Sequence, residues 1–266
     1  MGNSMAFVWR EHKQNIRLIT KMAVMNMGKQ TVRSTLGIFW TYFHDFIYIL
    51  VFIVFRMLIA GGGDIMGMDS TFYMVSGMIP WFFLNDVLTQ GSMAIRSNQG
   101  IVQSIRFPVV VLPTVEVCSI LLKRMFTFAV LFVIAAVYGY MRTFRPMLFL
   151  YYLLCSVVLS VAMNLVISAL VAVSDDFKQL YDALLRVLIY TVPILWDFSY
   201  VDSAGLHVLL RLNPMVYVIK GFRSAFVYGS TQNAGYAVYF WMCVLLFFAA
   251  GSCMQDRLKR YYADFV

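Results

Sequence analysis

The sequence predicts an all-α integral membrane protein with six transmembrane helices. Of its 266 residues, 61% are hydrophobic and only 13% are charged, and the mean hydropathy is +0.76, whereas soluble domains are about half apolar and a quarter charged. The apolar residues stand in continuous runs rather than alternating with polar ones, which favours helices over a β-barrel. A span needs about 20 mostly apolar residues, so the chain has room for six spans and little else.

Residues 1–33 form a basic leader in which apolar side chains are interspersed among Lys and Arg. This pattern predicts an amphipathic helix that lies on the inner membrane surface. A merely solvated basic leader is the alternative. Residues 34–266 then form the six-helix transmembrane domain.

The first span is predicted at Leu36–Ala60 and contains His44 and Asp45. Ionisable side chains at membrane depth are costly and face a polar interior or one another. These two are therefore either a local pair or part of a translocation path. The second span runs from Phe72 to about Thr89.

The remaining spans are predicted at Val109–Tyr140, Met147–Val173, Leu180–Phe198 and Tyr236–Cys253. In the third span, Lys123 and Arg124 are expected near the inner boundary. In the fifth span, Asp182 and Arg186 have the i, i+4 spacing of a helical ion pair. Pro193 is expected to kink that helix.

Residues 200–235 contain two apolar pieces of roughly ten residues, which are too short to span a bilayer. They are joined at Asn213-Pro214. Because proline cannot continue a helix without losing a backbone hydrogen bond, we expect the helix to break there.

Residues 72–113 have the pattern of a segment that leaves the bilayer and enters it again. The stretch is apolar at first, becomes polar from Gly91, and is apolar again after Arg106. We expect a short cytoplasmic helix at Ser92–Arg106 that suits the transmission of motion. An ordinary inner loop is the alternative.

Several strings of the sequence resemble one family. They are GMIPWFF, GSMAI and FPVVVLP in this stretch, RSTLGIFW before it, and LNPMVYVIKGFR after it. They are similar to the permeases of type 2 ABC exporters, which move lipid-linked polysaccharides, O-antigens, capsules and teichoic acids. The resemblance extends from Gln30 to Arg223 in four blocks. His44 and Asp45 depart from it, since the family usually has a Pro-Leu pair there.

The resemblance implies a homodimer that assembles with two copies of a separate ABC ATPase in the bacterial cytoplasmic (inner) membrane. ATP and Mg²⁺ would be bound by the partner subunit, so this chain would bind no cofactor and would be no enzyme by itself. The segment between the second and third spans would be a cytoplasmic coupling helix. Its ATPase-contacting residues would be Arg96, Ser97, Asn98, Gln99, Ile101, Val102, Ile105 and Arg106.

The resemblance also implies a re-entrant helical hairpin at the outer face, at about residues 200–235. Its residues Arg211, Asn213, Pro214, Lys220 and Arg223 would line an exit. There the cations would bind the pyrophosphate of a lipid-linked glycan. Alternatively, they only extend to outer-leaflet headgroups.

Aromatic residues make up 17% of the chain and are the main chemical signal. Sugars stack their C–H faces on aromatic rings, and a path for a glycan would use such rings. The candidates are Phe39, Trp40, Tyr42, Phe43, Phe46, Tyr190 and Trp196. Plain lipid-facing and helix-packing aromatics are the alternative.

The net charge of +8 is explained by membrane topology rather than by a nucleic-acid partner. Fifteen of the 21 Lys and Arg residues fall in segments that we predict to be cytoplasmic. This bias favours both termini inside and contact with anionic lipid headgroups.

The sequence contains no constellation that supports catalysis, metal binding or nucleotide binding. Two other functions remain open: export of a drug or small lipid, and a membrane-embedded glycosyl- or acyltransferase. The transferase would need clustered acidic or histidine side chains, whereas Asp45, Glu116 and Asp182 stand on separate predicted helices. An ion-coupled secondary transporter would show repeated halves, which the sequence lacks.

Overall fold

The computed structural model describes residues 2–29, 38–60, 64–65, 67–100, 107–198 and 202–258. These residues are almost entirely helical, apart from a two-stranded hairpin of β1 (Asp64–Ile65) and β2 (Met68–Asp69). The α-helices are α1 (Gly2–Gln14), α2 (Ile16–Lys29), α3 (Ile38–Ala60), α4 (Ser70–Ser92), α6 (Leu112–Val137), α7 (Pro146–Val173), α8 (Asp175–Thr191), α9 (Ala204–Arg211), α10 (Pro214–Arg223) and α11 (Ala234–Leu258). Shorter helical turns are η1 (Arg96–Asn98), η2 (Val109–Val111), η3 (Tyr140–Arg142) and η5 (Ser224–Tyr228).

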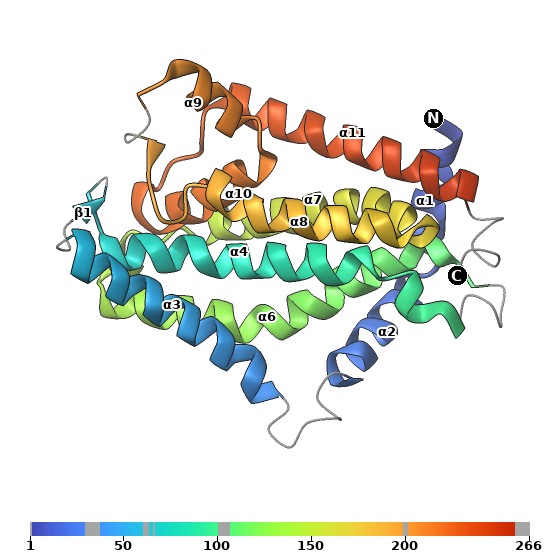
Figure 1. Ribbon diagram of the computed structural model, residues 1–266, viewed down its shortest axis with the longest axis horizontal. Coiled ribbons are helices and arrows are strands. Elements are labelled where there is room, and N and C mark those ends of the chain that lie inside the picture. Colours follow the sequence, from blue (N-terminus) through green and yellow to red (C-terminus); the bar gives the residue numbers. More distant parts are fainter. Residues whose placement is uncertain are drawn as a thin grey trace.

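The long helices α4, α6, α7, α8 and α11 run along the long axis of the molecule, and α3 leans on the side formed by α4 and α6 (Figure 1). The strand β1 and the helix α9 lie at one end, which we call the hairpin end. The helix α1, the last turn of α11 and residues 93–100 lie at the opposite end, which we call the coupling end.

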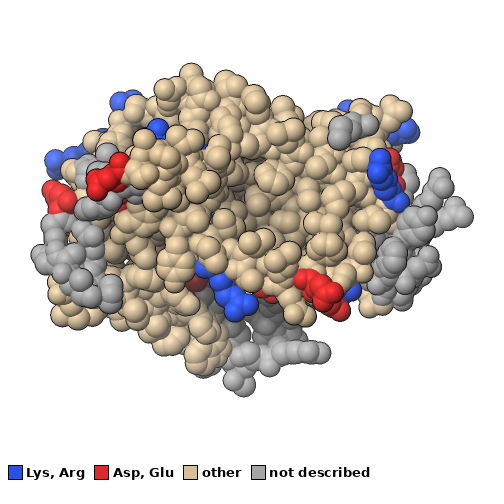
Figure 2. Space-filling view, turned by 45° about the horizontal axis from the view of Figure 1, so that its top comes forward, with Lys and Arg blue, Asp and Glu red and all other residues tan. Residues whose placement is uncertain are grey.

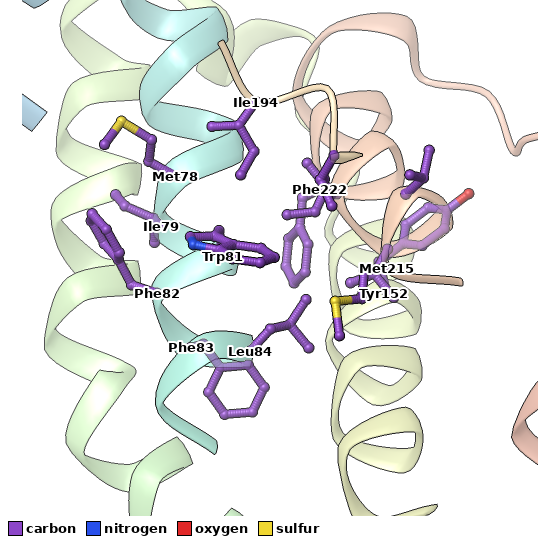
Figure 3. Packing of buried hydrophobic residues seen from close by; sticks show 14 of the residues in the cluster. Met78, Ile79, Trp81, Phe82, Phe83, Leu84, Tyr152, Ile194, Met215 and Phe222 are labelled. Atoms are coloured by element: carbon purple, nitrogen blue, oxygen red, sulfur yellow. The ribbon is translucent and has the colours of Figure 1, made fainter. Parts of the chain in front are cut away.

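Helix α4 is the centre of the bundle. Asp69 caps its first turn by accepting hydrogen bonds from the backbone N–H groups of Thr71 (2.8 Å) and Phe72 (3.2 Å). Every residue from Phe72 to Leu84 is buried. A helix that is apolar on all sides belongs inside its bundle. In Figure 3, Trp81 extends from α4 toward Phe222 of α10, which shows how the core joins the two helices.

Helices α7 and α11 form the most extensive helix pair, and a small residue lets them approach closely. A Cβ on Gly251 of α11 would lie 2.6 Å from the Cβ of Leu165 on α7. The side-chain amide of Gln255 donates to the carbonyl of Leu165 (3.0 Å) and to the hydroxyl of Ser168 (3.2 Å). Small residues and interhelical hydrogen bonds of this kind are typical of helix pairs in membranes.

The leader consists of two helices that dock on the bundle, α1 against α11 and α2 against α6. Val8, Ile19 and Ala23 are buried in this contact. A ring nitrogen of His12 lies 2.7 Å from the hydroxyl of Thr114. Over residues 2–29 the leader is helical, but it forms two helices rather than the one predicted. Its position on a membrane surface stays a prediction.

Three described helices are long and apolar enough to cross a membrane: Val109–Val137, Pro146–Val173 and Ala234–Leu258. They include most of the predicted third, fourth and sixth spans. Figure 2 shows that the charged side chains of one face gather at the two ends and along one edge, with a broad uncharged band between them. The protein is therefore an all-helical membrane protein with three clear apolar spans.

The predicted fifth span differs from the structure in two respects. Helix α8 (Asp175–Thr191) begins earlier than expected and ends before Pro193, so this proline lies after the helix rather than at a kink. The predicted pairing of Asp182 with Arg186 is wrong. Lys178, one turn earlier, forms the ion pair with Asp182, while the Arg186 side chain donates to the Asp182 carbonyl at 3.3 Å.

Candidate functional site

A cavity of about 570 Å³ opens at the hairpin end, between α10, the beginning of α11 and the segment that follows α8. Three cations line it, Arg211, Lys220 and Arg223, together with one carboxylate, Asp197. The rest of the wall is mainly tyrosine and amide side chains. All three hairpin cations singled out in the sequence therefore meet in one place.

The helical break that positions these cations is at the predicted residues. Helix α9 ends at Arg211 and α10 begins at Pro214. The Asn213 side chain caps α10 by accepting from the Met215 N–H (3.0 Å). Its amide also donates to the hydroxyl of Thr191 (3.1 Å) at the end of α8. Asn213 and Pro214 thus shape the hairpin rather than line the cavity.

Arg223 is 2% exposed, and its guanidinium is committed to backbone carbonyls. It donates to the carbonyl of Tyr73 on α4 (3.0 and 3.2 Å), to that of Pro193 (2.5 Å) and to that of Ile194 (3.0 Å). The last two carbonyls lie just after α8 ends, where helical partners are missing. Since buried carbonyls must be paired, Arg223 fastens this non-helical segment to α4.

Arg211 and Lys220 meet at one aromatic ring. The Lys220 ammonium lies 4.0 Å from the ring centroid of Phe198, and the Arg211 guanidinium carbon lies 5.5 Å from the same centroid. Cation–π contacts of this kind hold a charge beside a ring without neutralising it. Asp197 is 2% exposed, and its carboxylate accepts from the Tyr73 hydroxyl (3.3 Å).

Two tyrosines of α11 form another wall of the cavity. The rings of Tyr236 and Tyr239 are stacked, with centroids 6.1 Å apart. Their hydroxyls donate to the carbonyls of Arg211 (3.1 Å) and Leu212 (2.5 Å). The hydroxyls therefore fix the rings against the end of α9. Sequence reasoning missed both residues; their position at the start of an apolar helix was the available signal.

At the coupling end, the structure describes the first half of the predicted coupling segment. Helix α4 continues to Ser92, and Arg96, Ser97 and Asn98 form the single turn η1. Arg96 makes an ion pair with Asp175 at the start of α8. Asn98 caps locally by donating to the Ala94 carbonyl (2.8 Å). Gln99 follows η1, whereas Ile101, Val102, Ile105 and Arg106 lie outside the described residues.

We call Ile95 together with η1 the coupling turn; Ile95 is buried there, whereas no residue of η1 is buried. Ile95 packs against Ala172 of α7, with Val109 and Leu258 alongside. The turn is therefore attached to the ends of α7 and α11. A displacement of η1 would therefore be transmitted directly to α7 and α11.

The predicted path residues of α3 lie on an open face. Phe39, Trp40 and Phe43 are exposed, and their rings contact one another. Phe46 lines a second cavity of about 430 Å³ between α3, α4 and α6. Tyr42 lines the same cavity, and its hydroxyl donates to the Lys123 carbonyl of α6 (2.7 Å).

The two path residues near the end of α8 also stand apart from the α3 rings. Tyr190 is 73% exposed. The indole N–H of Trp196 donates to the backbone carbonyl of Tyr190 (3.2 Å). Among the described side chains, no ring contact joins this pair to Phe39, Trp40 or Phe43. The path formed by these rings stays a prediction.

An ion cluster that sequence reasoning missed joins α3, α4 and α6. The guanidinium of Arg124 makes ion pairs with Asp45 and with Asp86. Asp45 thus pairs neither with His44 nor with a residue of its own helix; the ring of His44 meets the Trp40 carbonyl instead (2.5 Å). Asp86 within an otherwise apolar segment was the signal that could have revealed the cluster.

Within the described ranges, no group of three or more His, Cys, Asp or Glu side chains could hold a metal ion. The four cysteines are free thiols. The two cavities and the exposed rings thus present charge and aromatic surface.

Comparison with known proteins shows which family the chain belongs to. The family model described as "ABC-2 type transporter" matches residues 16–227. A curated relative, the O-antigen export system permease protein RfbA of Myxococcus xanthus, is 25% identical over 259 residues, which are 95% of this chain and 96% of the relative. The family match extends over much more than half of the chain and includes the coupling turn, the ion cluster and the four charged residues of the hairpin-end cavity. The chain therefore belongs to the ABC-2 type transporter family, and this membrane permease domain hydrolyses no ATP by itself.

Proposed function

We propose that the chain is the transmembrane subunit of an ATP-driven exporter for a lipid-linked cell-envelope glycan. The glycan would be a teichoic acid, an O-antigen or a capsular polysaccharide, moved across the bacterial cytoplasmic membrane. One observation carries the proposal: the likeness to a permease named for O-antigen export includes 95% of this chain and 96% of that relative. The likeness thus extends along the whole sequence rather than being confined to one motif.

The side chains support a glycan cargo. Exposed rings of α3 (Phe39, Trp40, Phe43) and of α8 (Tyr190) offer stacking surfaces for sugar C–H faces. Because one copy leaves these two faces apart, the path would form between two copies of the chain. The working unit would then be a homodimer.

An ABC permease works with an ATPase, which in this proposal is a separate chain present in two copies. Closure of the ATPases would push residues 92–106 and the leader. Helices α3, α4 and α8 would complete six spans, with both termini in the cytoplasm and the hairpin end outside. The ion pair between Arg96 and Asp175 supports this coupling, since it links the turn to α8.

The test is a deletion of this chain in its host. We expect the envelope glycan to disappear from the cell surface while the lipid-linked glycan accumulates on the inner leaflet, measured by surface immunolabelling and by lipid extraction. Re-expression of the intact chain should restore both. A chain whose loss leaves surface glycan unchanged but raises sensitivity to a drug would support the alternative, export of a drug or small lipid.

A further inference from the structure

The cavity at the hairpin end is large enough for a ligand and unbalanced in charge. Its volume of about 570 Å³ lies within the roughly 300–1,000 Å³ of small-molecule sites. The charged residues of its described lining are three cations (Arg211, Lys220, Arg223) and one carboxylate (Asp197), an excess of two positive charges.

The cations are not equivalent. Arg223 donates to three backbone carbonyls and is fully enclosed, so it is part of the cavity's frame. Lys220 and Arg211 instead share the ring of Phe198, at 4.0 and 5.5 Å from its centroid. Two like charges beside one ring repel each other, and an anion placed between them would be attracted by both.

Burial makes the charge of Lys220 costly. Desolvation lowers the pKa of its ammonium to about 8; Arg211 and Arg223 act in the same direction, while Asp197 opposes them. The cavity therefore holds a cation that its own surroundings do not fully compensate. Helix α10 has 10 residues and is too short to span a bilayer. Asn233 and Gly235 of the cavity lining are exposed, so water and soluble anions can enter the cavity.

The geometry matches a phosphate ester. Arginine presents a planar fork of donors that fits phosphate oxygens in pairs, and lysine adds a compact point charge. The stacked rings of Tyr236 and Tyr239 form the neighbouring wall, and their hydroxyls are already engaged with the carbonyls of Arg211 and Leu212. The surface that the two rings present to the cavity, rather than to each other, is available for the C–H groups of a sugar or glycerol unit beside the phosphate.

We propose that this cavity is an anion-binding site for a phosphate or diphosphate ester, with Lys220 and Arg211 as the residues that bind the anion. Arg223 holds the cavity open, and Tyr236 with Tyr239 contacts the organic group attached to the phosphate. Two sources share this chemistry: an outer-leaflet phospholipid headgroup and the diphosphate of a lipid-linked glycan. The second source rests on the proposed function; the anion site itself does not.

The experiment measures binding of inorganic pyrophosphate to the full chain, purified in dodecyl maltoside, a detergent without phosphate. Isothermal titration at pH 7 compares wild type with Lys220→Met and Arg211→Gln. We expect each substitution to weaken binding at least tenfold. The matched control is Arg142→Gln, which removes an exposed cation of η3 that does not line the cavity, and it should stay within twofold of wild type.

A pH series identifies Lys220. Its ammonium is protonated well below pH 8 and loses its proton above it, so wild type should lose its affinity advantage over Lys220→Met between pH 7 and pH 9. The probe is the same in both proteins, so its own ionisation cancels in this ratio.

A last arm separates the two sources. Phosphatidylglycerol is added to the micelles, and competition with pyrophosphate identifies a headgroup site, whereas undiminished pyrophosphate binding identifies a site for the glycan's diphosphate. Either result upholds the anion site. The proposal is overturned if wild type does not bind pyrophosphate, or if folded Lys220→Met and Arg211→Gln bind it as wild type does. Neither failure touches export itself, which the deletion experiment tests.

Discussion

Arg223 has unusual surroundings for a buried arginine, because backbone carbonyls take the place of a carboxylate. The chain leaves helical geometry after α8, and the carbonyls of Pro193 and Ile194 would otherwise be unpaired. Gly77 on α4 makes room for this arrangement. A Cβ at that position would lie 2.4 Å from the Arg223 Nη2 atom.

We therefore predict that Gly77→Ala destabilises the protein by about 1–3 kcal/mol, the usual cost of an overpacked core. The guanidinium has to move, and its hydrogen bonds to the carbonyls weaken. A lower midpoint of thermal unfolding in detergent is the measurement. Gly28→Ala is the control, since a Cβ there meets nothing within 4 Å and alanine favours a helix. If Gly77→Ala and wild type have the same midpoint of thermal unfolding, the contact between Arg223 and the backbone carbonyls is not rigid.

The same residues show what a sequence can reveal at this scale. The break at Asn213-Pro214 follows from a local rule, the missing N–H of proline, and it is present as predicted. The partners of Arg223 could not be predicted in this way. They lie 150 residues earlier, at Tyr73, and 30 residues earlier, at Pro193, and only the packing of α4 against α10 brings them together.

At the scale of the elements, the attachment of α3 depends on charge. Asp45 of α3 and Asp86 of α4 share the guanidinium of Arg124, which is 4% exposed. A buried cation with two carboxylates retains a partner when one of them is lost. When both are lost it is uncompensated, at a typical cost of about 3–5 kcal/mol.

We predict that Asp45→Asn and Asp86→Asn are each mild and that the double variant loses more stability than the sum of the two. Adding Arg124→Met to the double variant should restore most of the loss, since an apolar side chain of similar length suits the buried position. Thermal unfolding of the four variants checks this cycle. Strict additivity, or no rescue by Arg124→Met, would contradict a shared cation.

A second element-scale prediction concerns the coupling turn, where Arg96 pairs with Asp175 of α8. Arg96→Asp should uncouple ATP hydrolysis from export because it places two carboxylates together. The exchange Arg96→Asp with Asp175→Arg restores the pair and should recover at least half of the coupling. Hydrolysis and export are measured on the assembled transporter. Assembly without recovery would mean that Arg96 acts on the ATPase directly.

Sequence patterns predicted the positions of these helices better than they predicted the contacts between side chains. Long apolar runs predicted α6, α7 and α11 closely because length and hydropathy decide a span. The predicted Asp182–Arg186 pair failed because Lys178 offers the same spacing on the other side. The cluster around Arg124 was missed because its three members come from three helices, and no local pattern connects them.

For the whole molecule, the two ends differ in the chemistry that they present. The coupling end holds α1, the end of α11 and the turn with Arg96, while the hairpin end holds β1, α9 and the cationic cavity (Figure 1). Fifteen of the 21 Lys and Arg residues belong to segments that the sequence predicts to be cytoplasmic, among them the leader and residues 92–106. Loops rich in these residues stay in the cytoplasm, so we expect the coupling end inside and the hairpin end outside.

Cysteine labelling in intact cells tests this orientation. The four native cysteines are first replaced by alanine, and single cysteines are then placed at Asp64 and Asn233 of the hairpin end or at Asn98 and Lys178 of the coupling end. A membrane-impermeant maleimide should label the first pair in intact cells and the second pair only after permeabilisation. All four backbone positions lie in or beside turns or helix ends, so access depends on the side of the membrane rather than on burial in an apolar helix. Labelling of Asn98 in intact cells would reverse the orientation, and the coupling turn would then have no access to a cytoplasmic ATPase.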